Sequence, residues 1–280
     1  MRRMKMLALP SGEKIPAFGI GTWRMGDEAR ARAEEIATLR LALDLGARLI
    51  DTAEMYGEGR AESLIAEAIH GRRDEAFIVS KVYPHNASRK GAVAACDRSL
   101  KRLATDRIDL YLLHWRGSIP LAETMEAFLT LRDAGKIRHF GVSNFDIGDM
   151  EELWPVRGGS ESATNQVLYN LSRRSAEWAL LPWLRKHRVP LMAYSPVEQG
   201  RLLANRKLTE FARTHGMTAA QASVAWLLAK DDVIVIPKTG SRDRLKENLG
   251  ALERPLTQQQ LAELDRMFPP PKERQSLDML

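Results

Sequence analysis

Cysteine is almost absent from this chain of 280 residues, in which Cys96 is the only one. A single thiol excludes an internal disulfide and a metal site built from several thiolates, and it is typical of a reducing compartment. Long apolar runs are also missing, since no stretch approaches the roughly 18 consecutive apolar residues of a membrane span. The apolar run within residues 1–10 is too short for a secretory signal. We therefore expect a cytoplasmic protein without a membrane partner.

Several motifs for phosphates, metals and nucleic acids are missing too. The stretch Gly19-Ile20-Gly21 lacks the third glycine of the dinucleotide-binding fingerprint, and no Walker-type loop occurs. No basic run is interleaved with aromatic residues, so we expect no nucleic-acid partner. We also predict no metal site, because five of the histidines show no pairing at metal-ligand spacing: His70, His85, His139, His187 and His215. Asn170-Leu171-Ser172 matches a glycosylation pattern, which means little without secretion.

The composition is that of an ordinary soluble protein, with 44% apolar and 28% charged residues. Lys and Arg number 42 against 36 Asp and Glu, which gives a net charge of +6. This excess would suit an anionic ligand, although a solvated basic surface explains it equally well. At roughly 150 residues per domain the length allows one large domain or two small ones. No break in composition marks a linker, so we expect a single domain over residues 1–280.

Short apolar runs alternate with helix-like stretches along most of the chain, which predicts parallel strands joined by crossover helices. Eight runs are candidate strands: Phe18–Ile20, Leu49–Ile50, Phe77–Val79, Ile108–Leu113, Ile137–Val142, Ala163–Val167, Pro190–Tyr194 and Val233–Ile236. Helices are expected between them, for example at Ala29–Leu45, Ser88–Leu103 and Leu121–Ala134. Eight such repeats in about 250 residues predict an α/β fold of the closed (β/α)8 TIM barrel type.

Glycines and prolines mark the ends of some of these elements. Gly46 and Gly135 follow two of the predicted helices and are expected to cap them. Apolar residues on both sides of Ser11-Gly12 predict a small N-terminal hairpin that plugs one end of the barrel. The residues after the run Pro269–Pro271 are expected to form a surface loop.

Polar side chains end almost every predicted strand. They are Asp51, Lys81, His114, Ser143, Asn144, Gln166, Tyr194, Ser195 and Lys238. The active site of a (β/α)8 barrel lies at the C-terminal ends of its strands, so we expect these side chains to meet at one mouth. Asp, Lys, His and Tyr together can carry acid–base chemistry. Each residue alone also has a structural interpretation, as a cap, a surface lysine or a buried histidine.

Five blocks at these strand ends occur in the order in which the aldo-keto reductase family has them. They are residues 51–57 (DTAEMYG), 79–82 (VSKV), 112–115 (LLHW), 141–145 (GVSNF) and 236–239 (IPKT). The chain resembles that family from about Phe18 to Asn248. The resemblance implies reduction of a carbonyl by NAD(P)H, with Asp51, Tyr56, Lys81 and His114 as the catalytic residues.

The expected roles follow from the charge that hydride transfer places on the carbonyl oxygen, which needs a nearby acid. Tyr56 is the expected acid. A free tyrosine has a pKa of about 10, so Lys81 is expected to supply the positive charge that its phenolate needs. Asp51 would pair with this buried lysine. Neutral His114 would orient the carbonyl by a hydrogen bond.

The resemblance also implies a cofactor site. Ser143, Asn144 and Gln166 are expected to bind the nicotinamide carboxamide, and Tyr194 to stack on the ring. Ser195, Pro196 and Val197 begin a loop that should cross the pyrophosphate. Further contacts are expected from Gly21, Thr22, Trp23 and Asp51 for the cofactor as a whole, from Lys238, Thr239 and Arg244 for the 2′-phosphate, and from Glu247 and Asn248 for the adenine. The cationic pair near a helix start favours NADPH over NADH, although an ordinary basic helix start is the alternative.

Aromatic residues are expected to line the substrate pocket, whose predicted members are Trp23, Tyr56, Tyr83, His114 and Trp115. Flat apolar faces suit small aldehydes and ketones. Bacterial members of the family that reduce methylglyoxal or 2,5-diketo-gluconate are the most similar in pattern. Candidate substrates are therefore 2-oxoaldehydes such as methylglyoxal and sugar-derived carbonyls. Arg116 would favour an anionic or polar substrate.

Two other functions stay open at this point. One is a cofactor-binding regulatory subunit on the same scaffold, with little turnover. The other is an unrelated barrel enzyme, such as a hydrolase or an isomerase, which would explain the fold but not the five ordered blocks. The resemblance implies a monomer.

Overall fold

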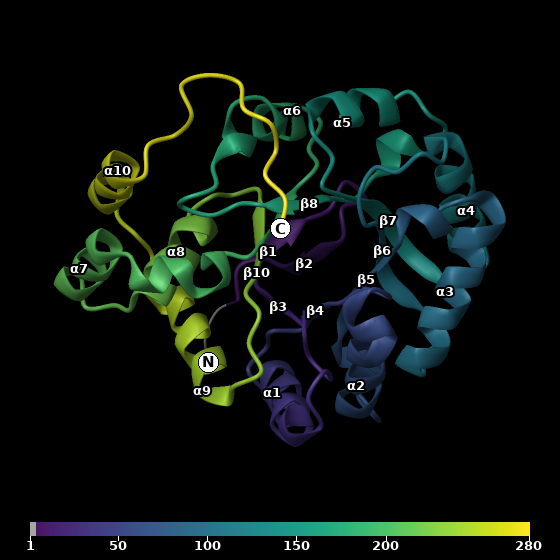
Figure 1. Ribbon diagram of the computed structural model, residues 1–280, viewed down its shortest axis with the longest axis horizontal. Helices are drawn as coiled ribbons and strands as arrows, with labels where there is room; N and C mark the ends of the chain where they lie inside the picture. Colours follow the sequence, from purple (N-terminus) through teal and green to yellow (C-terminus); the bar gives the residue numbers. More distant parts are fainter. Residues whose placement is uncertain (1–3) are drawn as a thin grey trace.

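A computed structural model describes residues 4–280 and shows a barrel of eight parallel strands ringed by helices (Figure 1). The strands of the barrel are β3 (Gly19–Gly21), β4 (Leu49–Asp51), β5 (Phe77–Val82), β6 (Ile108–Leu113), β7 (Ile137–Ser143), β8 (Asn165–Leu168), β9 (Leu191–Tyr194) and β10 (Val233–Ile236). Each pairs in parallel with the next along the chain. The backbone N–H of Val235 donates to the Ala17 carbonyl at 2.9 Å and closes the ring between β10 and β3. The predicted (β/α)8 barrel is confirmed.

Helices connect successive strands and cover the outside of the barrel (Figure 1). The α-helices are α1 (Arg32–Asp44), α2 (Arg60–Ala68), α3 (Arg89–Leu103), α4 (Leu121–Asp133), α5 (Ile147–Leu153), α6 (Leu180–Lys186), α7 (Arg206–Thr214), α8 (Ala219–Leu228), α9 (Arg242–Leu249) and α10 (Gln258–Met267). Shorter 3-10 helices are η1 (Ala29–Ala31), η2 (Tyr56–Gly59), η3 (Arg73–Glu75), η4 (Pro84–Asn86), η5 (Gly159–Glu161), η6 (Ser175–Glu177), η7 (Glu198–Ala204) and η8 (Gly250–Glu253). No helix within residues 4–280 is long and apolar enough to cross a membrane.

The core explains why the strands could be found as continuous apolar runs. Every residue of β5 and β6 is buried. A parallel strand has the barrel interior on one face and helices on the other, so both faces favour apolar side chains. A polar residue in such a strand needs a partner, and Lys81 of β5 is one of these exceptions.

The hairpin of β1 (Met6–Ala8) and β2 (Lys14–Pro16) is antiparallel, as predicted. Glu13 lies in its turn region and contacts β7. Its carboxylate accepts a hydrogen bond from Nη2 of Arg138 at 2.7 Å and lies 2.7 Å from Nε2 of His139. Both partners are near the N-terminal end of β7. The hairpin therefore packs at the end of the barrel opposite to the C-terminal ends of the strands.

Some predicted boundaries shift by a few residues. The helix predicted at 29–45 begins with the 3-10 turn η1 before α1, and Glu28 places no side-chain cap on this turn. The strand predicted at 163–167 is β8, which begins and ends slightly later. Gly46 and Gly135 follow α1 and α4 with φ angles of 85° and 71°, the left-handed conformation expected of glycine at a helix end.

The last residues of the chain form a mostly exposed loop, as predicted. The path of this loop was not predicted. It runs from α10 back over the barrel, and the C-terminus lies above the barrel centre in Figure 1. The backbone N–H of Leu280 reaches the hydroxyl of Tyr194 at 3.4 Å. An exposed, non-periodic segment carries no sequence signal for such a return.

Candidate active site

A buried ion pair lies at the centre of the barrel mouth. Asp51 ends β4, and Lys81 lies near the end of the neighbouring β5. Nζ of Lys81 is 2.8 Å from Oδ1 and 2.9 Å from Oδ2 of Asp51, and it also donates to the Thr52 carbonyl at 2.7 Å. The exposed fraction is 0% for Lys81 and 3% for Asp51. An unpaired ammonium would be costly here, so the carboxylate is what allows the lysine to be buried in its charged form.

Tyr56 follows β4 and begins the 3-10 turn η2. Its hydroxyl lies 3.3 Å from Nζ of Lys81. Burial, and secondarily the negative charge of Asp51, raise the pKa of Tyr56 well above its ordinary value. The phenol is therefore protonated at neutral pH. The ammonium of Lys81 beside it would stabilise the phenolate that forms when the proton leaves.

The turn after Tyr56 needs a glycine. Gly57 has a φ angle of 57°, in the left-handed region. A Cβ atom at this position would lie 2.5 Å from Oδ1 of Asp27. The DTAEMYG block therefore fixes the tyrosine through its backbone as well as through its side chain.

His114 follows β6 and is 8% exposed. Its ring lies edge-on to that of Tyr56, with centroids 5.9 Å apart and planes at 72°. Burial, and then the positive charge of Lys81, lower the pKa of His114 to about 2. The imidazole is therefore neutral. Its Nδ1 atom is buried and has no hydrogen-bond partner within residues 4–280.

The residues predicted to bind nicotinamide connect to this centre by hydrogen bonds. Nε2 of Gln166 donates to Oδ1 of Asp51 at 2.7 Å. Asn144 has a φ angle of 57° and donates from Nδ2 to the His114 carbonyl at 3.1 Å. The hydroxyl of Tyr194 donates to Oδ1 of Asn144 at 3.0 Å. Ser143 is buried beside them and donates to the Gln166 carbonyl at 2.9 Å.

A second group of predicted cofactor residues lies further along the rim. Thr22 accompanies Asp51, since its Oγ1 donates to the Asp51 carbonyl at 2.9 Å. Gly21 forms a parallel β-bridge with Lys238, which lies a few residues before α9. The strand ends thus connect the central ion pair to the predicted phosphate site. Trp23 comes next and is partly exposed, with the guanidinium of Arg24 over its ring at 4.4 Å.

The predicted phosphate site is cationic and open. Lys238 and Arg244 are exposed, and neither has a carboxylate within 4.0 Å among the residues described. Although much of Lys238 is exposed, partial desolvation of its ammonium lowers its pKa; Glu35 opposes this, while Arg24 and Arg244 add to the lowering. Extra negative charge would relieve the repulsion among these cations, so this group fits a phosphate dianion. Of the remaining predicted residues, Thr239 and Asn248 are buried and Glu247 is half-buried.

Aromatic rings surround the mouth next to His114. The Trp115 ring lies 4.9 Å from His114 and 5.8 Å from Tyr83, centroid to centroid. Arg116, which is expected to favour an anionic or polar substrate, has its guanidinium bonded within the protein. Its guanidinium donates to Glu152 at 2.9 Å and to the Ile119 carbonyl at 3.1 Å, so it holds its own loop together.

Sequence reasoning missed the residues that hold the loop after β9. Pro196 in this loop is buried, and Ser195 and Val197 are half-buried. Nδ2 of Asn170 donates to the Ser195 carbonyl at 2.9 Å and to Oε2 of Glu198 at 2.7 Å. Asn170 is fully buried. The sequence marked it only as part of a glycosylation pattern, and no local signal connects it to a loop on the next strand.

Comparison with known proteins identifies the family. The model of the aldo/keto reductase family matches residues 17–268. The chain is 47% identical over 283 residues to methylglyoxal reductase YeaE of Escherichia coli (strain K12), which covers 99% of this chain and 100% of the relative. An aldo-keto reductase from Klebsiella pneumoniae, crystallised in complex with NADPH, superposes with a TM-score of 0.96 at 45% identity, covering 99% of this chain and 100% of the other.

A crystal structure described as that of a putative 2,5-diketo-D-gluconic acid reductase B is also similar. Its TM-score is 0.84 at 36% identity, and the match covers 98% of this chain and 95% of the other. These similarities extend over nearly the whole chain and agree with the five sequence blocks. The chain belongs to the aldo/keto reductase family.

Proposed function

We propose that this chain reduces small aldehydes and ketones to alcohols with NADPH, and that Tyr56 donates the proton. One observation carries the proposal: a protonated phenol lies 3.3 Å from a buried ammonium that is itself paired with a carboxylate. The relatives support the same class of reaction, since one is a methylglyoxal reductase and another was crystallised with NADPH.

The residues of the chain fit NADPH at both ends. Ser143, Asn144 and Gln166 offer hydroxyl and amide groups next to the catalytic centre, as a carboxamide requires. Lys238 and Arg244 offer cations without carboxylate partners within the described part of the chain, as a 2′-phosphate requires. When bound, the dihydronicotinamide supplies a hydride to the carbonyl carbon.

The chain's own contribution is the proton. As negative charge develops on the carbonyl oxygen, the O–H bond of Tyr56 breaks and its proton moves to that oxygen. The phenolate left behind lies beside the Lys81 ammonium, whose charge is worth more in this buried site than it would be in water. Asp51 keeps the lysine charged, and the phenolate later takes a proton from solvent.

His114 orients the carbonyl rather than exchanging protons with it. With a pKa of about 2, the imidazole is neutral at pH 7. Nδ1 has no partner among the described residues, so a proton there would make no hydrogen bond. The favoured tautomer therefore carries its proton on Nε2, and this N–H is the donor available to a carbonyl oxygen.

The substrate class we propose is small 2-oxoaldehydes, of which methylglyoxal is the simplest test. Trp115 and Tyr83 lie against each other beside His114, and their apolar surfaces suit a compact carbonyl compound. The methylglyoxal reductase among the relatives supports this choice.

Loss of NADPH absorbance with methylglyoxal and a panel of small aldehydes tests the proposal. Tyr56→Phe removes the acid and should lower kcat about 100-fold or more. Tyr111→Phe is the matched control, because it removes a buried hydroxyl that has no partner in the described structure. Near-normal turnover in Tyr56→Phe would contradict the role of Tyr56. NADPH binding without turnover of any carbonyl would favour the regulatory subunit instead.

A further inference from the structure

We propose that Arg173 is a positioning residue that couples two segments at the active site, the cofactor loop and the C-terminal segment. We call residues 195–204, after β9, the cofactor loop, and residues 272–280 the C-terminal segment. The inference rests on the proposed function, because it assumes that the cofactor loop contacts the cofactor. Arg173 contacts neither substrate nor cofactor in this proposal and acts through two carboxylates.

The first carboxylate is Glu198, in the cofactor loop. Nε of Arg173 donates to its Oε1 atom at 3.0 Å, and Nη2 of Arg201 donates to the same atom at 2.9 Å. Glu198 is 3% exposed and has a φ angle of 51°, a strained value for a residue with a side chain. Burial alone would raise the pKa of Glu198, but hydrogen bonds from Asn170, Arg173 and Arg201 lower it overall. The side-chain bonds therefore hold this loop conformation in place.

The second carboxylate is Asp278, two residues before the last residue of the chain, Leu280. Nη1 of Arg173 lies 3.2 Å from its Oδ1 atom. Two residues later, the N–H of Leu280 donates to the hydroxyl of Tyr194 at 3.4 Å. Tyr194 is the residue expected to stack on the nicotinamide. One guanidinium thus connects the cofactor loop to a segment that ends beside the nicotinamide site.

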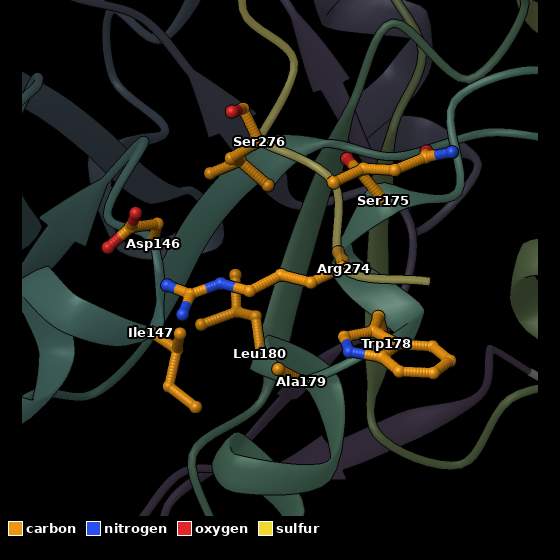
Figure 2. A pocket seen from close by; sticks show the side chains of 11 residues that line it. Asp146, Ile147, Ser175, Trp178, Ala179, Leu180, Arg274 and Ser276 are labelled. Carbon is orange, nitrogen blue, oxygen red and sulfur yellow. The ribbon is translucent and has the colours of Figure 1, made fainter. Parts of the chain in front are cut away.

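The C-terminal segment depends on few attachments. A cavity of about 260 Å³ separates Arg274–Leu277 from the wall formed by α5, η6 and Trp178. Figure 2 shows Arg274 extending its guanidinium across this cavity toward Asp146 and Ile147. Leu277 packs on the core, but most of the segment is exposed. With so little packing, the ion pair at Asp278 is a substantial part of what holds the segment closed.

The coupling follows from these contacts. A cofactor bound at Ser195–Val197 would further stabilise the loop next to Glu198, and Glu198 would in turn hold the Arg173 guanidinium beside Asp278. Linkage makes the effect reciprocal, so a closed segment must also strengthen cofactor binding by the same factor. The Arg173–Asp278 pair is partly exposed, so we expect a two- to fivefold effect, the scale of such ion pairs.

Trypsin cleavage after Arg274 provides the readout. Cleavage there releases the peptide of residues 275–280, which mass spectrometry can follow over time. NADP+ should slow this release two- to fivefold in the wild type. The protection should vanish in Arg173→Gln and in Asp278→Asn, and both variants should bind NADP+ two- to fivefold more weakly by tryptophan fluorescence.

Arg201→Gln is the matched control, because Arg201 contacts Glu198 but not Asp278. Arg201→Gln should keep the protection by NADP+. If the substitutions acted only by weakening the loop, Arg201→Gln would lose the protection as Arg173→Gln does. Equal release with and without NADP+, in a wild type shown by fluorescence to bind it, would overturn the coupling. Faster release with NADP+ would overturn it too. Failure of the wild type to bind NADP+ at all would instead overturn the proposed function.

Discussion

The ammonium of Lys81 and the carboxylate of Asp51 lie 2.8 Å apart at the centre of the barrel mouth, almost completely shielded from solvent. Burial lowers the pKa of Lys81, while the charge of Asp51 and its hydrogen bonds to the lysine work against that shift. The ion pair is therefore what keeps a buried lysine charged. Removing the carboxylate should therefore change the pH dependence of activity.

Asp51→Asn should shift the pH at which activity is lost. Without the opposite charge the pKa of Lys81 falls further. Lys81 must be charged to stabilise the Tyr56 phenolate, so the alkaline limb of the kcat–pH profile should move to lower pH. Stability should also fall, by about 3–5 kcal/mol, because a buried ammonium loses its partner.

Asp44→Asn is the control for Asp51→Asn. Asp44 forms a partly exposed ion pair with Arg72 at 2.8 Å. Its loss should cost at most about 1 kcal/mol and leave the pH profile of activity unchanged. An alkaline limb that stays in place in Asp51→Asn would show that Lys81 does not need this carboxylate to remain charged.

Much of this site could be predicted because barrel strands end at a common mouth. Asp51, Lys81 and His114 each follow an apolar run, and the register of neighbouring parallel strands brings them together without any information about side-chain contacts. The apolar runs were visible because both faces of these strands are buried. Sequence blocks of a known family then supplied the expected roles.

Side-chain contacts between residues far apart in the sequence could not be predicted in the same way. Asp278 pairs with Arg173 over a separation of 105 residues, and Gln166 reaches Asp51 over 115. The first depends on the path of an exposed loop, which has no apolar periodicity to reveal it. The second depends on a side-chain rotamer at a strand end. The contact of Arg116 with Glu152 depends in the same way on how a loop and the helix α5 pack together.

His114→Asn should make folding stability less sensitive to acid. His114 takes up a proton only near pH 2 in the folded chain, whereas a histidine in the unfolded chain does so near its ordinary pKa of 6.5. Between these values the unfolded state binds more protons, so stability falls as the pH falls. From pH 6.5 to about pH 4.5 this one group accounts for about 2 kcal/mol.

Urea unfolding at these two pH values measures the effect. The loss of stability between them should be about 2 kcal/mol smaller in His114→Asn than in the wild type. His70→Asn, at an exposed position, should keep the wild-type loss. Identical losses in the wild type and in His114→Asn would mean that His114 is protonated in the folded state as readily as in the unfolded one.

Cys96 should not react with thiol reagents in the folded protein. It is fully buried in α3, and burial raises the pKa of its thiol to about 12. Only the thiolate is an efficient nucleophile, so neither access nor ionisation allows reaction at neutral pH. Titration with a disulfide reagent should detect no thiol in the native chain and one after denaturation. Rapid labelling of the native chain would show that α3 opens easily.

Lys238 and Arg244 should determine the preference for NADPH over NADH. Replacing either residue by Ala removes a charged hydrogen-bond donor from the proposed 2′-phosphate site, and such bonds contribute about 1.5–3 kcal/mol. NADPH affinity should therefore fall about 10- to 100-fold, while NADH affinity should change little because NADH lacks that phosphate. Lys246→Ala, at another exposed position of α9, should affect neither cofactor. Equally weakened binding of NADPH and NADH would show that Lys238 and Arg244 contact a part that both cofactors share. The preference for NADPH would then have to come from other residues.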